Sequence, residues 1–158
     1  MMKDKILSAI VMAALCVIAV VVILIGVYLV PLSHQTATAN PTLGHMRVPV
    51  LMMGWLILTC VLTLLAVAFA FLLRISQNKI FEQKSVSLLK TMAMISLAPI
   101  PVLIALFFYT QANVTGSITN FWVLIGILGL AIVSIFFFLV ASLFQKAVDY
   151  KTDVELTI

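Results

Sequence analysis

Few side chains in this chain could carry out chemistry, and they lie mostly between or beyond long apolar runs. No Asp, Glu, Arg or His lies deep within those runs, and Lys90 stands near the end of one, where its stem can reach the lipid headgroups. Proton-coupled transporters and ion pumps usually need an ionisable group inside the membrane. No nucleophile–base pair, glycine-rich phosphate loop or metal-binding helix motif is present either. We therefore expect no catalytic residue, no cofactor and no enzymatic activity.

The two histidines, His34 and His45, could bind a metal or respond to mild acid. They stand eleven residues apart with no carboxylate nearby, which is a poor arrangement for a metal. We interpret them as part of a flexible, solvated connection rich in Ser and Thr, and we expect no metal site. The two cysteines, Cys16 and Cys60, lie inside apolar runs. We expect them to pack as small side chains rather than to form a disulfide.

A polar segment between the second and third apolar runs is a stronger candidate for function. It reads RISQNKIFEQKSV over residues 74–86. Ser85 is expected to cap the start of the third helix, since a Ser hydroxyl accepts a hydrogen bond from an orphan backbone N–H. Phe81 stands among polar residues. It could lie against the headgroups or the base of the helices, or it could anchor a partner, as exposed apolar side chains do.

The C-terminal segment, residues 145–158, is the other polar candidate. Its last five residues alternate apolar and polar types, which is the period of a β-strand. Such a segment could add to a sheet edge or dock its carboxylate on a partner. Its acids could equally pair with Lys79 or Lys84, or the whole segment could be solvated and frayed. From the two segments we take the following residues as a candidate partner surface: Asn78, Lys79, Phe81, Glu82, Asp149, Glu155, Leu156 and Ile158.

Long apolar helices must position these polar segments. Of 158 residues, 65% are hydrophobic and 9% are charged, and the mean hydropathy is +1.30, so the chain cannot cover itself with a water-soluble surface. Four apolar runs each exceed the roughly 20 residues that cross about 30 Å of hydrocarbon as a helix. The first run is longer than a signal-peptide core, so we expect it to be a true span. The predicted fold is an all-α polytopic membrane protein, a bundle of four transmembrane helices in a single membrane domain, residues 1–158. Its predicted spans are residues 6–30, 48–73, 88–109 and 121–144, followed by a cytoplasmic tail, residues 145–158.

The Lys and Arg residues predict the orientation of these spans, because they are enriched in cytoplasmic loops. Eight of the nine flank the same side of the spans: Lys3, Lys5, Arg74, Lys79, Lys84, Lys90, Lys146 and Lys151. Only Arg47 lies in the connections on the other side. Both termini and the second connection are therefore predicted to be cytoplasmic. Tyr28, Tyr109 and Trp122 then fall near the outer interface, where amphipathic rings are favoured.

Small side chains and prolines suggest how the helices pack. Close approach in lipid depends on small residues, so we expect the following stripes to face the interior: Ala9, Ala13 and Cys16; Thr59, Thr63, Ala66 and Ala70; Gly126, Gly129, Ser134 and Ala141. Pro99 and Pro101 lie in the middle of the third span, where each removes a backbone donor. They predict either a fixed kink or a hinge.

The two polar segments also resemble a known family. Asn78-Lys79-x-Phe81 is similar to the N-K-x-F signature of the DUF2975 family. The stretch from Ala147 to Lys151, together with the ending Leu156-Thr157-Ile158, is similar to that family's A-[IV]-D-x-K…D-L-T-[VI] terminus. Glu155 stands where the family usually has Asp, which leaves the charge intact.

The resemblance implies a bacterial inner-membrane protein, often encoded beside a small helix-turn-helix DNA-binding regulator. On that basis the expected function is non-enzymatic: a sensor or a sequestering partner of such a regulator, with lipid around it and no direct contact with nucleic acid. The alternative is a small transporter or permeation protein, or a self-protection factor against membrane-active peptides. The stimulus, the oligomeric state and the identity of the partner are left open.

Overall fold

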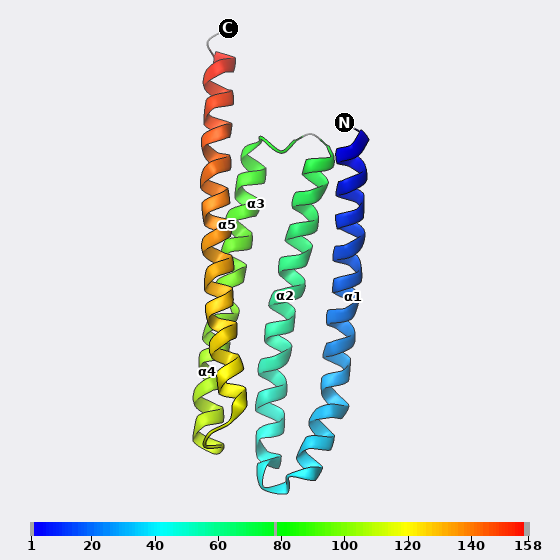
Figure 1. Cartoon of the computed structure of the whole chain (residues 1–158), viewed down its shortest axis with the longest axis vertical. Coiled ribbons are helices and arrows are strands. Elements are labelled where there is room, and N and C mark those ends of the chain that lie inside the picture. The colour runs from blue at the N-terminus through cyan, green and yellow to red at the C-terminus, as the bar shows by residue number, and fades with distance from the viewer. Residues whose placement is uncertain (1, 78, 157–158) are drawn as a thin grey trace.

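The computed structural model describes residues 2–77 and 79–156. The molecule is elongated, and its long helices run side by side along its long axis (Figure 1). The order of elements is α1 (Met2–Ala39), the 3₁₀ helix η1 (Pro41–Met46), α2 (Arg47–Ser76), α3 (Gln83–Leu97), α4 (Pro99–Asn113) and α5 (Ile118–Leu156). The described residues contain no strand. The predicted all-α class is therefore confirmed.

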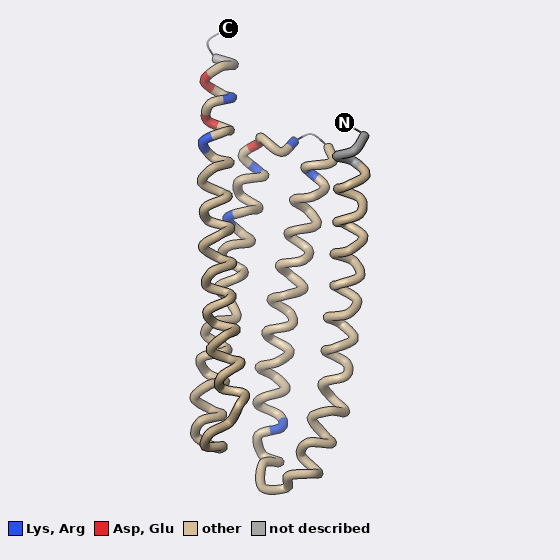
Figure 2. The backbone as a smooth tube through the Cα atoms, viewed as in Figure 1, with Lys and Arg blue, Asp and Glu red and all other residues tan. Residues whose placement is uncertain are grey.

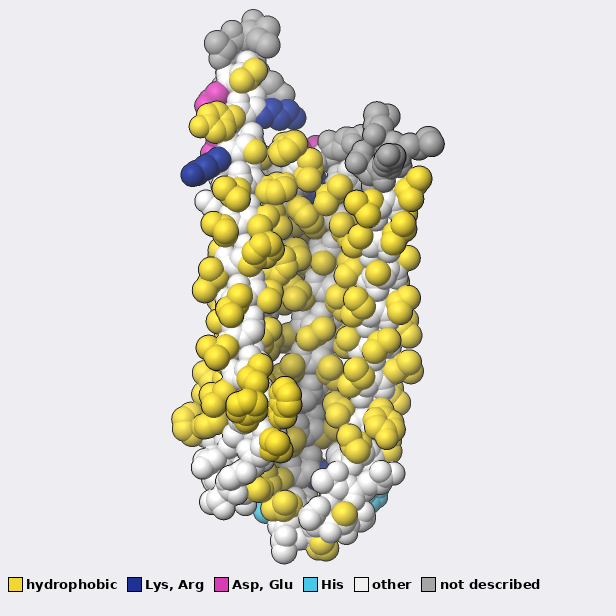
Figure 3. Space-filling view, viewed as in Figure 1, with side chains coloured by type: hydrophobic (Ala, Val, Ile, Leu, Met, Phe, Trp, Pro, Cys, Tyr) yellow, Lys and Arg dark blue, Asp and Glu magenta, His cyan; other side chains and the backbone are white. Residues whose placement is uncertain are grey.

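Four helical segments are long and apolar enough to cross a membrane. They are Ile6–Ala39, Pro41–Ser76, Gln83–Asn113 and Ile118–Val154. Each predicted span lies within one of these segments, and the third segment comprises both α3 and α4. Figure 3 shows apolar side chains covering the visible face between the two ends, as a surface in contact with lipid requires. The chain is a multi-pass membrane protein.

The predicted flexible connection after the first span is mostly helical. Helix α1 runs through Pro31 to Ala39, and the turn that follows is the short η1. The hydroxyls that suggested a loop bond within α1 instead: Ser33 donates to the Val30 carbonyl at 2.7 Å and Thr36 donates to the Leu32 carbonyl at 2.9 Å. Because these polar groups are satisfied by the helix itself, they do not interrupt it.

The two prolines of the third span produce a break between helices. Helix α3 ends at Leu97 and α4 begins at Pro99, with Ala98 between them. Pro99 has no N–H, and the backbone N–H of Ala98 donates instead to the Ile95 carbonyl at 3.2 Å. Pro99 is buried and occupies the first position of α4, where a proline costs no hydrogen bond, whereas Pro101 is exposed. The predicted irregularity is therefore present and its freed carbonyl has a partner.

The helices form an open arrangement in which α1 packs against α2 but not closely against α5. Helix α3 packs along α5, α2 contacts both α3 and α4, and α4 also contacts α5, whereas α1 packs mainly against α2 (Figure 1). The core forms around Leu89, Met92 and Ala141, with Phe71 from α2 and Phe144 from α5 packed against it. Helix α3 thus lies at the centre, and α1 lies at the edge with most of its surface open to lipid.

The small-residue stripes were predicted correctly for only one helix. On α5, Ser134 and Ala141 are buried, and Gly126 lies where an added Cβ would come within 3.7 Å of the Leu103 side chain. Gly129 of the same stripe is exposed. The first stripe is wrong, because Ala9, Ala13 and Cys16 are all exposed, and the second is wrong for Thr59, Thr63 and Ala66, which are exposed as well.

Helix α1 instead turns a neighbouring face toward α2. Ser8 donates to the Leu72 carbonyl at 3.4 Å, and the Trp55 indole N–H donates to the Gly26 carbonyl at 3.2 Å. At Gly26 an added Cβ would lie 3.3 Å from the Leu58 side chain, so the two helices approach closely there. These two bonds place the contact face of α1 one residue away from the predicted alanine stripe.

Candidate functional site: the charged end

Charged side chains gather at one end of the molecule. We call residues 74–90 and 145–154 the charged end, and residues 33–47 and 110–119 the opposite end. In Figure 2 the acids and the Lys and Arg residues that are drawn in colour lie at the charged end, with the exception of Arg47. Both segments that carry the family resemblance belong to this end.

A short loop joins α2 to α3 at the charged end, and hydrogen bonds hold it. The backbone N–H of Lys79 donates to the Arg74 carbonyl at 2.9 Å. The Ser85 hydroxyl donates to the Lys79 carbonyl at 3.0 Å, and Ser85 is fully buried. The predicted helix cap at Ser85 is therefore wrong. Glu82 occupies the N-cap position without a side-chain capping bond, and Ser85 holds the preceding loop from within the first turn of α3.

An ion pair spans the same loop. A guanidinium N–H of Arg74, at the end of α2, donates to the Glu82 carboxylate at 3.0 Å, with both side chains partly exposed. Glu82 was predicted to belong to a partner surface, but in the structure its charge is directed to Arg74. A partly exposed pair of this kind contributes little stability, on the order of 0–1 kcal/mol.

Phe81 joins the loop to α5. Its ring stacks on Phe144, with the centroids 6.0 Å apart and the planes at 24°, and Phe144 in turn meets Phe71 edge-on at 6.1 Å. Phe81 nevertheless remains 49% exposed. Of the two interpretations offered by the sequence, contact with the base of the helices is realised, and half of the ring is still accessible.

Two glutamines make the second link between the loop and α5. Gln83 and Gln145 exchange side-chain amide hydrogen bonds of 3.0 and 3.1 Å. Gln145 also donates to the Asp149 carboxylate at 2.9 Å, one turn further along α5. Within the described residues, Asp149 forms no ion pair with Lys79 or Lys84.

The described part of the C-terminal segment, residues 145–156, is a helix and not a strand or a frayed tail. Helix α5 continues without a break to Leu156, and it rises past the start of α3 as an isolated rod (Figure 1). We call residues 146–156 the projecting helix; at 1.5 Å per residue it extends about 16 Å beyond Gln145. Every described side chain from Asp149 to Val154 is exposed, and Tyr150 is 72% exposed. The alternating pattern of the last five residues therefore does not produce a strand at residues 154–156, and residues 157–158 lie outside the described part of the chain.

The structure brings together only part of the predicted partner surface. Lys79, Phe81 and Glu82 share the α2–α3 loop, and Asp149 lies on the projecting helix nearby. Asn78 and Ile158 lie outside the described residues, as do the side chains of Glu155 and Leu156.

The sequence did not indicate the role of Gln83 and Gln145, although both are uncharged polar residues next to apolar runs. Such residues are candidates for contacts between helix ends, and their pairing could have been considered on that ground. Phe144 was also missed, because an aromatic residue at the end of a span looks the same whether it faces lipid or a loop.

The remaining candidates form no further site among the described residues. His45 shares a 2.8 Å hydrogen bond with the Asn113 side-chain oxygen, which links η1 to the end of α4. His34 is exposed on α1. No group of three or more His, Cys, Asp or Glu side chains within the described part of the chain could hold a metal. Cys16 and Cys60 are both free, Cys16 on the lipid-facing surface.

A family model described as a protein of unknown function, DUF2975, matches residues 31–158. No curated protein and no solved structure matches the chain. The matched range includes both the α2–α3 loop and the projecting helix, so the family predicted from those two segments is confirmed.

Proposed function

The chain belongs to the DUF2975 family, and on that premise we propose that it is a non-enzymatic inner-membrane protein of a bacterium that holds a helix-turn-helix regulator at the membrane. In this proposal the charged end and both termini face the cytoplasm. The regulator docks on the projecting helix and the neighbouring α2–α3 loop. A signal that reaches the membrane part then changes how much regulator is free to bind DNA.

The distribution of charge supports this orientation. Among the residues drawn in colour in Figure 2, Arg47 is the basic residue of the opposite end. The six at the charged end are Arg74, Lys79, Lys84, Lys90, Lys146 and Lys151. Cytoplasmic loops carry such an excess of Lys and Arg. The projecting helix is then in the same compartment as a DNA-binding protein.

The projecting helix is the single observation that carries the proposal. The side chains from Asp149 to Val154 are exposed and do not pack on the rest of the bundle, and they form two distinct faces. Tyr150 and Val154 stand four residues apart and form an exposed apolar face, while Asp149 and Asp153 share a separate acidic face. Helices with such apolar anchors dock into grooves of their partners, and aromatic side chains dominate such contacts.

The acidic face supports a DNA-binding protein, rather than DNA itself, as the partner in this proposal. The carboxylates of Asp149 and Asp153 repel phosphates, so this face disfavours direct binding to nucleic acid. The same carboxylates attract the Lys and Arg side chains with which a regulator contacts the DNA backbone. Docking would therefore compete with DNA binding.

Co-purification from membranes tests the proposal. The full-length chain is purified with the helix-turn-helix protein encoded beside it, and the double variant Tyr150→Ala/Val154→Ala is compared with wild type. We expect the variant to lose most of the bound regulator. The matched control is Leu139→Ala/Leu143→Ala, which removes two exposed apolar side chains from the same helix within the apolar span. Equal retention of the regulator by both variants and wild type contradicts the proposal.

A further inference from the structure

A cavity opens at the opposite end of the molecule, between α1, α2 and the tips of α4 and α5. Its volume is about 470 Å³, which falls within the range of about 300–1,000 Å³ typical of sites for small ligands. Leu29, Leu32 and Leu106 form part of its apolar wall. The hydroxyl-bearing residues Ser33 and Thr110 line it as well. Apolar walls with a few convergent polar groups are characteristic of ligand sites.

Arg47 supplies the one positive charge of this cavity. It is half-buried at the start of α2, and its Nε donates to the Ser33 hydroxyl at 3.3 Å. A guanidinium carries five N–H donors, and within the described structure this is the only side-chain hydrogen bond that Arg47 makes. The sequence contains no Asp or Glu between Asp4 and Glu82, so the segment that forms the α1 and α2 walls offers no carboxylate to Arg47.

A partly buried arginine without a counter-ion is unfavourable unless an anion can approach it. The planar guanidinium fork matches phosphate and carboxylate, which it binds in a bidentate manner. We propose that the cavity binds an amphipathic anion, with the anionic group on Arg47, Thr110 lining the cavity beside it, and an apolar chain against Leu29, Leu32 and Leu106. A phospholipid with one chain inserted and a free fatty acid both have this chemistry.

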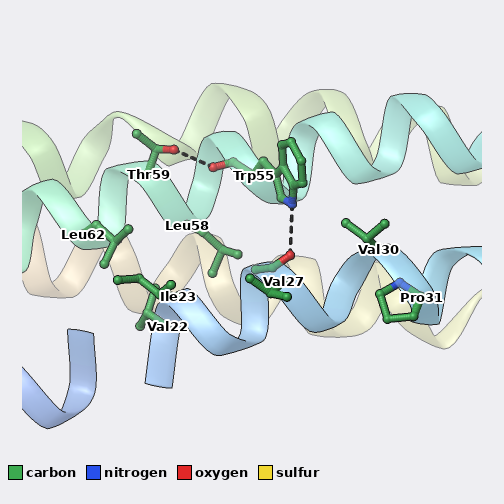
Figure 4. Close-up of a pocket in the computed structure, with 10 residues that line it drawn as sticks. Val22, Ile23, Val27, Val30, Pro31, Trp55, Leu58, Thr59 and Leu62 are labelled. Carbon is green, nitrogen blue, oxygen red and sulfur yellow. Dashed lines mark hydrogen bonds between the residues drawn. The ribbon is translucent and has the colours of Figure 1, made fainter. Parts of the chain in front are cut away.

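The larger groove between α1 and α2 does not offer the same chemistry. Its volume is about 620 Å³, and Val27, Leu58 and Pro31 are among the apolar residues that line it (Figure 4). The polar groups there are already used by the chain, because Trp55 donates to the Gly26 carbonyl and Thr59 donates to the Trp55 carbonyl (Figure 4). Of these two cavities, the one at Arg47 combines an apolar wall with guanidinium N–H groups that remain available to an anion.

Native mass spectrometry of the full-length protein in non-ionic detergent tests this site. Phosphatidylglycerol, phosphatidylcholine with identical chains, and dodecanoate are titrated separately. We expect phosphatidylglycerol or dodecanoate to bind more tightly than phosphatidylcholine. Arg47→Gln should weaken that binding by about tenfold or more, as the loss of charge-assisted hydrogen bonds predicts. Binding of phosphatidylglycerol alone identifies a lipid as the ligand, whereas binding of dodecanoate alone identifies a free acid.

Two further variants separate the cavity from a surface charge. Ala37→Phe places a ring where Ala37 lines the cavity, and it should reduce binding while Arg47 is intact. Arg47→Lys keeps the charge and should retain part of the affinity, which distinguishes lost binding from misfolding. Lys90→Gln, at the charged end, is the matched control and should bind as wild type. The inference is overturned if Arg47→Gln binds like Lys90→Gln, or if Ala37→Phe binds like wild type. None of these outcomes depends on the proposed regulator.

Discussion

Phe81 has two faces with different surroundings, one stacked on Phe144 and one open to solvent. Because the stacked face ties the α2–α3 loop to α5, Phe81→Ala should lower the free energy of unfolding by about 1 kcal/mol. Phe81→Leu keeps an apolar contact and should lose less. Thermal unfolding of the purified protein in detergent measures both changes. If Phe81→Ala leaves the free energy of unfolding unchanged, the ring does not hold the α2–α3 loop to α5.

Ser134 is the clearest case of a polar side chain that joins two helices inside the apolar region. It is 1% exposed, and its hydroxyl donates to the Ala93 carbonyl of α3 at 2.9 Å. Such a bond contributes about 0.6–2 kcal/mol in a membrane protein, so Ser134→Ala should destabilise the fold by that order. Ser142→Ala, an exposed serine of the same helix, is the matched control. Equal unfolding temperatures for the two variants contradict this role.

At the scale of elements, the break between α3 and α4 is expected to be a fixed kink. Pro99 is buried, and the Ile95 carbonyl it frees is taken by Ala98, so a bend once formed has little reason to change. Spin labels at Met94 and Phe108, both exposed, should give one narrow distance distribution in the wild-type protein. The double variant Pro99→Ala/Pro101→Ala restores both backbone donors and should shift that distance. A broad or two-peaked wild-type distribution would support a hinge instead.

The existence of the helices could be predicted from the sequence, whereas their packing faces could not. Length and hydropathy are local properties, and each predicted span lies within a helical segment. The inward face is not local, because lipid is as apolar as a helix interior and the two sides of a span have similar composition. The stripe at Ala9, Ala13 and Cys16 was therefore as plausible as the face containing Ser8 and Gly26 that actually meets α2.

The same reasoning applies to the candidate site. The polar segments were predicted because polar residues stand out beside apolar runs. The ion pair of Arg74 with Glu82 and the stacking of Phe81 on Phe144 depend on where the loop returns to α5, which no local pattern contains. The end of α5 was misjudged because five alternating residues were read apart from the helix that precedes them.

At the scale of the whole molecule, the account requires one orientation. Cysteines introduced at Thr38 and Thr115, exposed at the opposite end, should react with an impermeant thiol reagent in intact cells. A cysteine at Gln77, exposed at the start of the α2–α3 loop, should react only after lysis. Cys16 and Cys60 are replaced beforehand so that each signal has one source. Labelling at Gln77 in intact cells places the projecting helix outside and removes the basis of the proposed function.

The most direct test of the central claim uses cells that produce the protein without residues 154–158. Transcription of the genes controlled by the neighbouring regulator is measured in these cells. The deletion shortens the projecting helix and leaves the contacts of Phe81, Gln83 and Gln145 in place. We predict that transcription of the regulator's targets changes while the amount of the membrane protein stays the same. Unchanged transcription at normal abundance, together with loss of a transport or resistance phenotype in variants of the opposite end, would contradict the account.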